Sequence, residues 1–290
     1  MSGFRIVAVG ELLWDLLPDG RQLGGAPGNV AQHARSLGAD VVLISRVGRD
    51  ELGEAALARL EAAGLSTAGI QRDAEAPTGT AAVRVDRDGQ PHFDLAADVA
   101  WDHLAAVDPG PADAVYFGTL AQRAPTSRRT IRGLLDAGRL RVLDLNLRDP
   151  YWSEECIRTS LGLADVVKLS EHELDRCAAL LGLSGRLRDR MEQLARRHSI
   201  DYLAVTRGER GSLIRSRGEW AEHPGLAVPI RDAVGAGDAF TAALLMGLLR
   251  GDPLDRISRH ANDVAAYVCT QPGATPRLPE SLRDKVLEGR

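Results

Sequence analysis

The chain has 290 residues, of which 44% are hydrophobic and 26% are charged, a composition typical of a globular protein with a large core. Its formal net charge of -4 argues against the basic surface that nucleic-acid binding requires, so we expect no nucleic-acid partner. The three cysteines are widely spaced, which argues against a disulfide framework and a cysteine-rich zinc site. No apolar run approaches the roughly 20 residues of a membrane span, and acidic residues come too early for a signal peptide. We therefore expect a cytoplasmic protein without a membrane partner.

The lysine content limits how the chain can bind phosphate. Only two of the 36 basic residues are lysines, Lys168 and Lys285. Neither belongs to a glycine-rich loop that ends in Lys-Ser or Lys-Thr, so the phosphate-binding P-loop is absent. Any phosphate must be bound by backbone N–H groups, arginines or a metal ion.

In chain order, β-branched runs alternate with helical patterns. "FRIVAVG" (4–10) predicts a buried strand, "NVAQHARSLG" (29–38) a helix capped by Asn29 and ended by Gly38, and "DVVLISRVG" (40–48) a second strand. Further helices are predicted at 51–64, 126–138, 171–182 and 186–198, and further strands at 112–118, 140–146, 164–170 and 201–208. This alternation predicts an α/β fold in which a mainly parallel sheet lies between two layers of helices.

Two segments interrupt the alternation. Residues 11–25 and 77–97 have the pattern of short strands joined by turns, with no helix between them. We interpret them as a small sheet that projects from the core and acts as a lid over a cleft. Because no repeat, low-complexity tract or linker appears, residues 1–290 are expected to form a single domain.

The segment "DAVGAGDAFTAALL" (232–245) places two glycines directly before an apolar helix. Gly235 and Gly237 allow a tight turn and expose backbone N–H groups at the helix N-terminus, an arrangement that favours an anion. Asp238 can be interpreted as an acid that balances the helix dipole, but that role needs no glycine on both sides of Ala236. The segment therefore predicts an anion site next to a functional carboxylate.

Other polar segments follow predicted strands, where ligands bind in open parallel sheets. They are Asp15, "GGAPGN" (24–29), "DLNLR" (144–148), "KLSEHEL" (168–174) and "TRGERG" (206–211). Taken singly, each has a structural interpretation: Asp15 as a turn residue, Gly24 and Gly25 as a bend, and Glu173 as an exposed helix carboxylate.

Taken together, these segments resemble the ribokinase-like PfkB family of carbohydrate kinases over nearly the whole chain. "DAVGAGD" matches the C-terminal signature of that family, and "GGAPGNVA" after "GELLWDLLP" resembles the sugar-site pattern of fructokinases. "DLNLR", "TRGERG" and "PGATPRLP" match its other segments in the same order. The resemblance implies a ribokinase-like three-layer α/β/α core with a β-sheet lid, and phosphoryl transfer from ATP to a primary hydroxyl of a sugar, most closely fructose.

The resemblance also implies roles for individual residues. Asp238 would take the proton from the sugar hydroxyl, while the backbone N–H groups of Gly235, Ala236 and Gly237 would hold the transferring phosphoryl group. The implied sugar-binding residues are Asp15, Gly24, Gly25, Asn29, Asn146 and Arg148. The implied nucleotide-binding residues are Thr206, Gly208, Gly211, Asn262 and Lys168.

Ions and a partner follow from the same resemblance. Glu173 would organise Mg²⁺ through water, although Ser170 stands where the family has asparagine. Asp232, Val234 and Gly273 match a site for a monovalent cation such as K⁺ in many relatives. Ala233 replaces a frequent threonine and Arg277 falls near that loop, so dependence on K⁺ is left open. Relatives commonly pair their lids, which implies a homodimer.

The sequence leaves alternatives in the substrate and in the class of protein. The segment "HFDLAADVAWDHL" (92–104) lacks the Tyr-Arg pair common in fructokinases and ketodeoxygluconate kinases, so ribose, ketodeoxygluconate, another ketose or a nucleoside remain alternative substrates. A dinucleotide-dependent oxidoreductase is disfavoured because no glycine fingerprint follows the first strand. A non-catalytic sugar-binding protein on the same fold is disfavoured because Asp238 and its glycines are retained.

Overall fold

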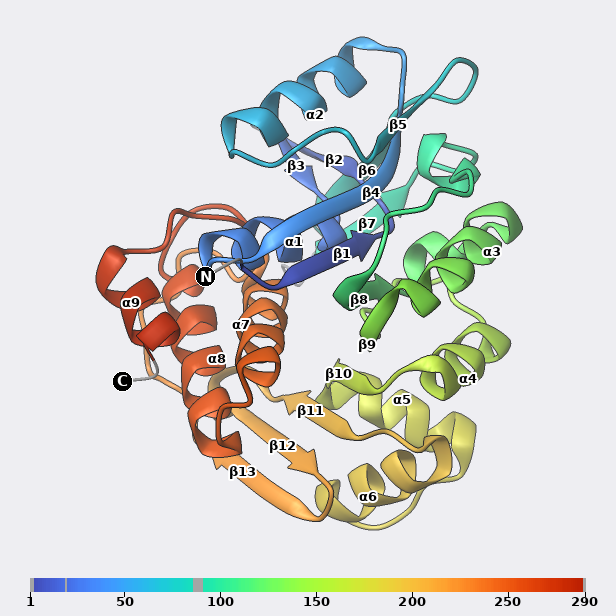
Figure 1. The fold of residues 1–290 in the computed structure, drawn as a ribbon. Helices are drawn as coiled ribbons and strands as arrows, with labels where there is room; N and C mark the ends of the chain where they lie inside the picture. The colour runs from blue at the N-terminus through green and yellow to red at the C-terminus, as the bar shows by residue number, and fades with distance from the viewer. Residues whose placement is uncertain (1–2, 19, 86–90, 289–290) are drawn as a thin grey trace.

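The computed structural model describes residues 3–18, 20–85 and 91–288. Its main sheet contains, in spatial order, β13 (Glu219–His223), β12 (Ser212–Ser216), β11 (Tyr202–Thr206), β10 (Val166–Ser170), β9 (Gly138–Asp144), β8 (Ala112–Gly118), β1 (Arg5–Val9), β4 (Asp40–Gly48) and β5 (Ile70–Asp73). From β11 to β5 the neighbouring strands run parallel, and only β12 and β13 add antiparallel pairs at one edge. The mainly parallel sheet predicted from the sequence is therefore confirmed (Figure 1).

Helices cover both faces of this sheet. One layer contains α1 (Ala26–Ser36), α2 (Glu51–Ala62), α7 (Ala236–Arg250), α8 (Leu254–Cys269) and α9 (Glu280–Glu288). The other contains α3 (Pro125–Leu134), α4 (Glu154–Leu163), α5 (Glu171–Leu181) and α6 (Leu187–His198). Short 3-10 helices occur at η1 (Ala100–His103), η2 (Leu120–Arg123), η3 (Leu135–Ala137) and η4 (Gly208–Arg210).

Strand β1 shows how the sequence produces two cores. Its side chains alternate between the faces of the sheet, so Val7 and Val9 pack in the core under α3 to α6, while Ile6 and Ala8 pack in the core under α1 and α7. All four are fully buried. The three-layer α/β/α arrangement predicted from the sequence is confirmed.

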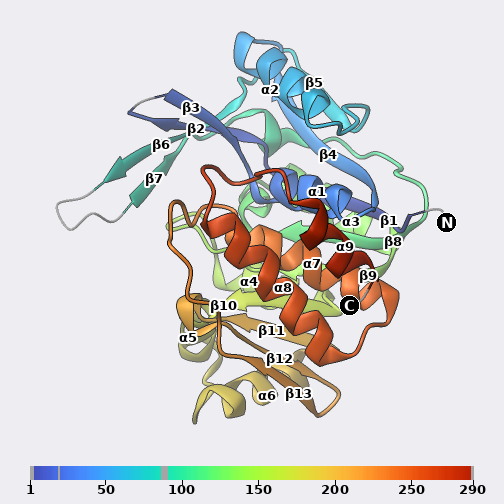
Figure 2. The same cartoon turned by 90° about the vertical axis from the view of Figure 1, so that its left-hand side faces the viewer.

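A second, four-stranded sheet has the order β3 (Gly20–Gly24), β2 (Leu13–Leu17), β6 (Gly79–Val85) and β7 (Pro91–Leu95). It consists of the two segments that interrupt the α/β alternation, and it projects from the core (Figure 2). Leu13, Ala81 and Leu95 are buried and join the core cluster beneath it. The small sheet expected from residues 11–25 and 77–97 is therefore present.

The start of α1 differs from the prediction. The helix begins at Ala26, after Gly25, whose φ of 108° suits glycine, and Pro27 occupies its first turn. Proline is favoured there because it lacks an N–H that would have no intrahelical partner. The prediction that Asn29 caps this helix was wrong, because Asn29 is its fourth residue and lies within its first turn.

Within the part of the chain that the structure describes, no helix combines the length and apolar character needed to cross a membrane.

Candidate active site

The N-terminus of α7 has the geometry that the glycine pattern predicted. Gly235 precedes the helix with φ of 78°, and a Cβ there would lie 2.3 Å from the carbonyl oxygen of Ala274. Only glycine fits this position. Ala236 donates a long 3.4 Å hydrogen bond to the carbonyl of Ala233, and the first N–H groups of a helix have no partner inside it. These N–H groups and the helix dipole make the N-terminus of α7 favourable for an anion.

Asp238 lies in the first turn of α7. Asn29 on α1 donates a hydrogen bond from Nδ2 to Asp238 Oδ2 at 2.8 Å. Burial raises the pKa of Asp238, and the Asn29 hydrogen bond and the charges of Lys168 and Arg148 act against that rise. These three partners favour the carboxylate, which is the form a general base needs.

A polar cavity of about 240 Å³ opens in front of Asp238. Among the residues that line it are Asp15, Gly25, Asn29, Asn146, Arg148, Gly235, Gly237 and Asp238. The structure therefore brings five of the six predicted sugar-binding residues together with most of the predicted anion site. The sixth, Gly24, lies behind Asp15: a Cβ at Gly24 would lie 2.4 Å from Asp15 Oδ2, so glycine leaves room for this carboxylate.

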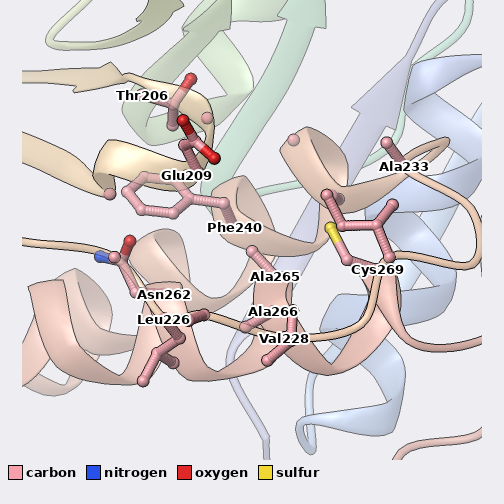
Figure 3. A pocket seen from close by; sticks show the side chains of 17 residues that line it. Thr206, Glu209, Leu226, Val228, Ala233, Phe240, Asn262, Ala265, Ala266 and Cys269 are labelled. Carbon is pink, nitrogen blue, oxygen red and sulfur yellow. The ribbon is translucent and has the colours of Figure 1, made fainter.

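A second cavity of about 650 Å³ also reaches the N-terminus of α7. The predicted nucleotide residues Thr206, Gly208, Gly211 and Asn262 line it, and most of its other side chains are apolar. Figure 3 shows Phe240 from α7 and Ala265 and Cys269 from α8 around this apolar cavity. Asn262 donates from Nδ2 to Ser212 Oγ and to the carbonyl of Ser258, both at 2.7 Å.

The two cavities meet at the start of α7. Ala233 and Gly237 line both of them, whereas Asp238 lines only the polar cavity. A molecule that fills the apolar cavity and extends past Gly237 would therefore reach the carboxylate of Asp238.

Lys168 lies in the polar cavity and does not line the apolar one, where a nucleotide-binding residue was expected. Its Nζ is 3.1 Å from both carboxylate oxygens of Asp144, which is fully buried. Burial is the largest effect and lowers the pKa of Lys168, but the charges of Asp144, Glu173 and Asp238 together outweigh it and leave that pKa raised. Thr241 on α7 also donates to Asp144, at 3.0 Å. The Lys168 ammonium is thus a fixed charge, and a Cβ added to Gly237 would lie 3.0 Å from its Nζ.

Glu173 is 8% exposed, so its interpretation as an exposed helix carboxylate was wrong. Its Oε1 accepts from the Leu147 N–H at 2.6 Å, and its Oε2 accepts from the Ser170 N–H at 2.7 Å. Ser170 in turn caps α5. No group of three or more acidic, histidine or cysteine side chains among the described residues is arranged to hold a metal ion.

The carboxylate of Asp232 joins two loops near the start of α7. Oδ1 accepts from the Val234 N–H at 2.9 Å and Oδ2 from the Gly273 N–H at 3.0 Å. The three residues predicted for a monovalent cation are therefore neighbours, and a cation there would share the carboxylate with two N–H groups.

Sequence reasoning overlooked Glu11 and Asp144. Both stand in segments that were recognised, "GELLWDLLP" and "DLNLR", and both follow or end a strand of the main sheet. Their position at a carboxyl end of a parallel strand was the available signal. The apolar residues Leu226, Val228 and Ile230 were also missed, because they lie in a loop without periodicity.

Comparison with known proteins places the chain among carbohydrate kinases. A family model described as pfkB family carbohydrate kinase matches residues 19–281. A fructokinase of Klebsiella pneumoniae is 32% identical over 303 residues, which cover 96% of this chain and 97% of the relative.

Solved structures give the same result. A fructokinase from Xylella fastidiosa with bound ATP matches with a TM-score of 0.85 and 27% identity, over 98% of both chains. A fructokinase from Vibrio cholerae O395 with bound fructose, ADP and calcium matches with a TM-score of 0.85 and 26% identity, over 99% of this chain and 100% of the other. The predicted ribokinase-like fold and the predicted enzyme class, a carbohydrate kinase, are confirmed. The chain belongs to the pfkB family of carbohydrate kinases.

Proposed function

We propose that the protein transfers the γ-phosphoryl group of ATP to a primary hydroxyl of a sugar, with fructose as the favoured acceptor. The observation that carries the proposal is the meeting of the polar and apolar cavities at Ala233 and Gly237, with Asp238 on the polar side. The apolar cavity suits the base and ribose of a nucleotide, and the polar cavity suits a molecule with several hydroxyls.

In the proposed reaction, a sugar hydroxyl lies next to Asp238 and gives its proton to the carboxylate. The sugar oxygen forms a bond to the γ-phosphorus, the bond from that phosphorus to the bridging oxygen breaks, and its electron pair leaves with ADP. The N–H groups of Gly235, Ala236 and Gly237 stabilise the charge on the transferred group. The buried Lys168 ammonium adds a fixed positive charge beside Gly237.

Asp15, Asn29, Asn146 and Arg148 are the proposed contacts to the sugar, and Gly25 allows close approach of its backbone. Mg²⁺, when bound with the nucleotide, would neutralise phosphate charge during transfer, and Glu173 is the proposed contact to its water ligands. Asp232, Val234 and Gly273 are the residues that would hold a monovalent cation such as K⁺.

Fructose is favoured because the Vibrio cholerae relative binds fructose and ADP. Ribose, ketodeoxygluconate, another ketose or a nucleoside remain alternative acceptors. We also propose that the four-stranded sheet closes over the bound sugar and pairs two copies into a homodimer, and that the single-domain enzyme works in the cytoplasm.

A coupled assay of ADP release with ATP and Mg²⁺ tests the proposal across these acceptors. We expect the highest kcat/KM with fructose, and phosphorus NMR should place the phosphate on a primary hydroxyl. Turnover with another acceptor alone would correct the substrate. If none of these acceptors supported ADP release, the proposed function would be contradicted.

A further inference from the structure

Glu11 is a buried carboxyl group that the proposed reaction does not use. It lies two residues after the end of β1, is 3% exposed and lines the polar cavity. Its Oε2 is buried and has no hydrogen-bond partner among residues 3–18, 20–85 and 91–288. A buried polar atom without a partner costs free energy of the order of 1–3 kcal/mol, so a fold that keeps one next to a cavity has a reason to keep it.

Glu11 lines the same polar cavity as Asp15, Arg148 and Asp238. Burial has the largest effect on the pKa of Glu11 and brings it to about 7, against the lowering effects of the backbone N–H groups of Glu11 and Ala26 and of Arg148; Asp238 raises it further. Asp15 also interacts with Arg148, and burial raises its pKa to about 6. Glu11, Asp15 and Asp238 thus line one cavity.

We propose that Glu11 is a further sugar-binding residue, and that its carboxyl group forms a hydrogen bond with a hydroxyl of the acceptor in the polar cavity. This inference rests on the proposed function. A carboxyl group that titrates near neutrality can donate or accept this hydrogen bond, and a sugar hydroxyl can complement either form.

Tyr116 on β8 offers a matched control. Its hydroxyl is also buried without a partner among the described residues and interacts electrostatically with Glu11, but Tyr116 does not line the polar cavity. If a buried water between Tyr116 and Glu11 satisfied both groups, removal of either group would have the same effect on the affinity for fructose. If Glu11 contacts the sugar, only the Glu11 variant changes its affinity.

The experiment is calorimetric titration of fructose, and of fructose analogues each lacking one hydroxyl, with a non-hydrolysable ATP analogue present. Glu11→Met keeps the length of the side chain without its hydrogen-bonding groups, and Glu11→Gln restores a donor and an acceptor. We expect Glu11→Met to weaken fructose binding about tenfold, the scale of one lost hydrogen bond, Glu11→Gln to recover most of it, and Tyr116→Phe to leave it unchanged.

The analogues identify the contact. One analogue should bind the wild-type protein about tenfold more weakly than fructose binds it. The same analogue should bind Glu11→Met with the same affinity as fructose binds Glu11→Met. Equal fructose affinity in Glu11→Met and wild type, or equal losses for every analogue in both proteins, would overturn the inference and leave the proposed function standing. Absence of binding of any tested sugar to the wild-type protein would overturn both.

Discussion

Asn29 Nδ2 donates a 2.8 Å hydrogen bond to Asp238 Oδ2, and so joins the first turns of α1 and α7 across 209 positions of the sequence. The bond fixes the orientation of the Asp238 carboxylate towards the polar cavity. It also favours the charged form of a group whose burial favours the neutral one. A residue predicted as a contact to the sugar is thus also a positioning residue for the proposed base.

Replacement of Asn29 by leucine should therefore alter the pH dependence of the reaction. Asp238 acts as a base only when ionised, so kcat/KM falls as the pH drops through its pKa. Loss of the Asn29 hydrogen bond raises that pKa, and the acid limb of the pH–rate profile should move to higher pH, with kcat about tenfold lower. Gln32→Leu on the same helix, outside the cavity, is the control. An acid limb in the same place as in wild type would show that this bond does not tune Asp238.

Asp15 and Asn262 should separate the two cavities functionally. Asp15 lines only the polar cavity and Asn262 only the apolar one. Asp15→Ala should weaken sugar binding about tenfold or more, the scale of a lost hydrogen bond to a charged group, and leave the Kd of ATP nearly unchanged. Asn262→Leu should weaken ATP binding and leave sugar binding nearly unchanged. Titration of each variant with both ligands measures this; unchanged sugar binding in Asp15→Ala would place the sugar elsewhere.

The sequence predicts the strands that are buried on both faces and the helices with clear ends. "DVVLISRVG" corresponds to β4 (Asp40–Gly48) without any shift, because β-branched residues and a glycine stop agree there. The start of α1 could not be placed in the same way. Asn29 is a good cap residue in isolation. The helix nevertheless begins earlier, at Ala26, because Gly25 adopts a conformation that suits glycine and Pro27 is favoured in the first turn.

The candidate site was predictable where glycine spacing carries chemistry, and less so where it does not. The Gly235, Gly237 and Asp238 pattern predicted the anion site before α7. Nothing in the local pattern distinguished Glu11 from an ordinary turn carboxylate, because its burial and its interactions with Ala26 and Arg148 involve segments distant in the sequence. The Lys168–Asp144 pair likewise depends on the register of β10 against β9, which aligns the two residues.

Burial of Glu11 should lower the stability of the free enzyme at neutral and alkaline pH. Burial raises the pKa of Glu11 from 4.5 to about 7, so between these values the unfolded chain has lost a proton that the folded one keeps. Stability is therefore lost as the pH rises through this window, by about 3 kcal/mol in full.

Glu11→Gln has no titrating group at this position. Its free energy of unfolding should therefore increase relative to that of wild type as the pH rises from 4.5 to 7, and the difference between the two proteins should be constant above that range. Chemical denaturation of both proteins at pH 5 and pH 8 measures the two free energies of unfolding. A stability difference that does not change with pH would contradict the burial of a titrating carboxyl group at position 11.

The four-stranded sheet should become protected when sugar binds. Leu13, Ala81 and Leu95 line the polar cavity, so closure over the sugar would bury the backbone of β6 and β7 and exclude water from the transfer. Hydrogen exchange with and without fructose should show slower exchange in peptides that cover 79–85 and 91–95. Unchanged exchange there would contradict a closing lid.

The other face of this sheet exposes Leu16, at 40%, which favours pairing with a second copy. Light scattering should give twice the monomer mass of 31.1 kDa, and Leu16→Glu should give the monomer mass. A wild-type monomer would contradict the dimer.

The central claim is that Asp238 takes the proton from the sugar hydroxyl, and steady-state turnover of Asp238→Asn tests it most directly. Asparagine keeps the shape of the side chain but cannot act as a base. With saturating ATP and fructose, turnover should fall by about 10²-fold or more, the usual scale for loss of a positioned general base. The Kd of ATP should stay close to the wild-type value, because Asp238 does not line the apolar cavity. Turnover of Asp238→Asn near the wild-type rate would contradict the claim and remove Asp238 from the chemistry.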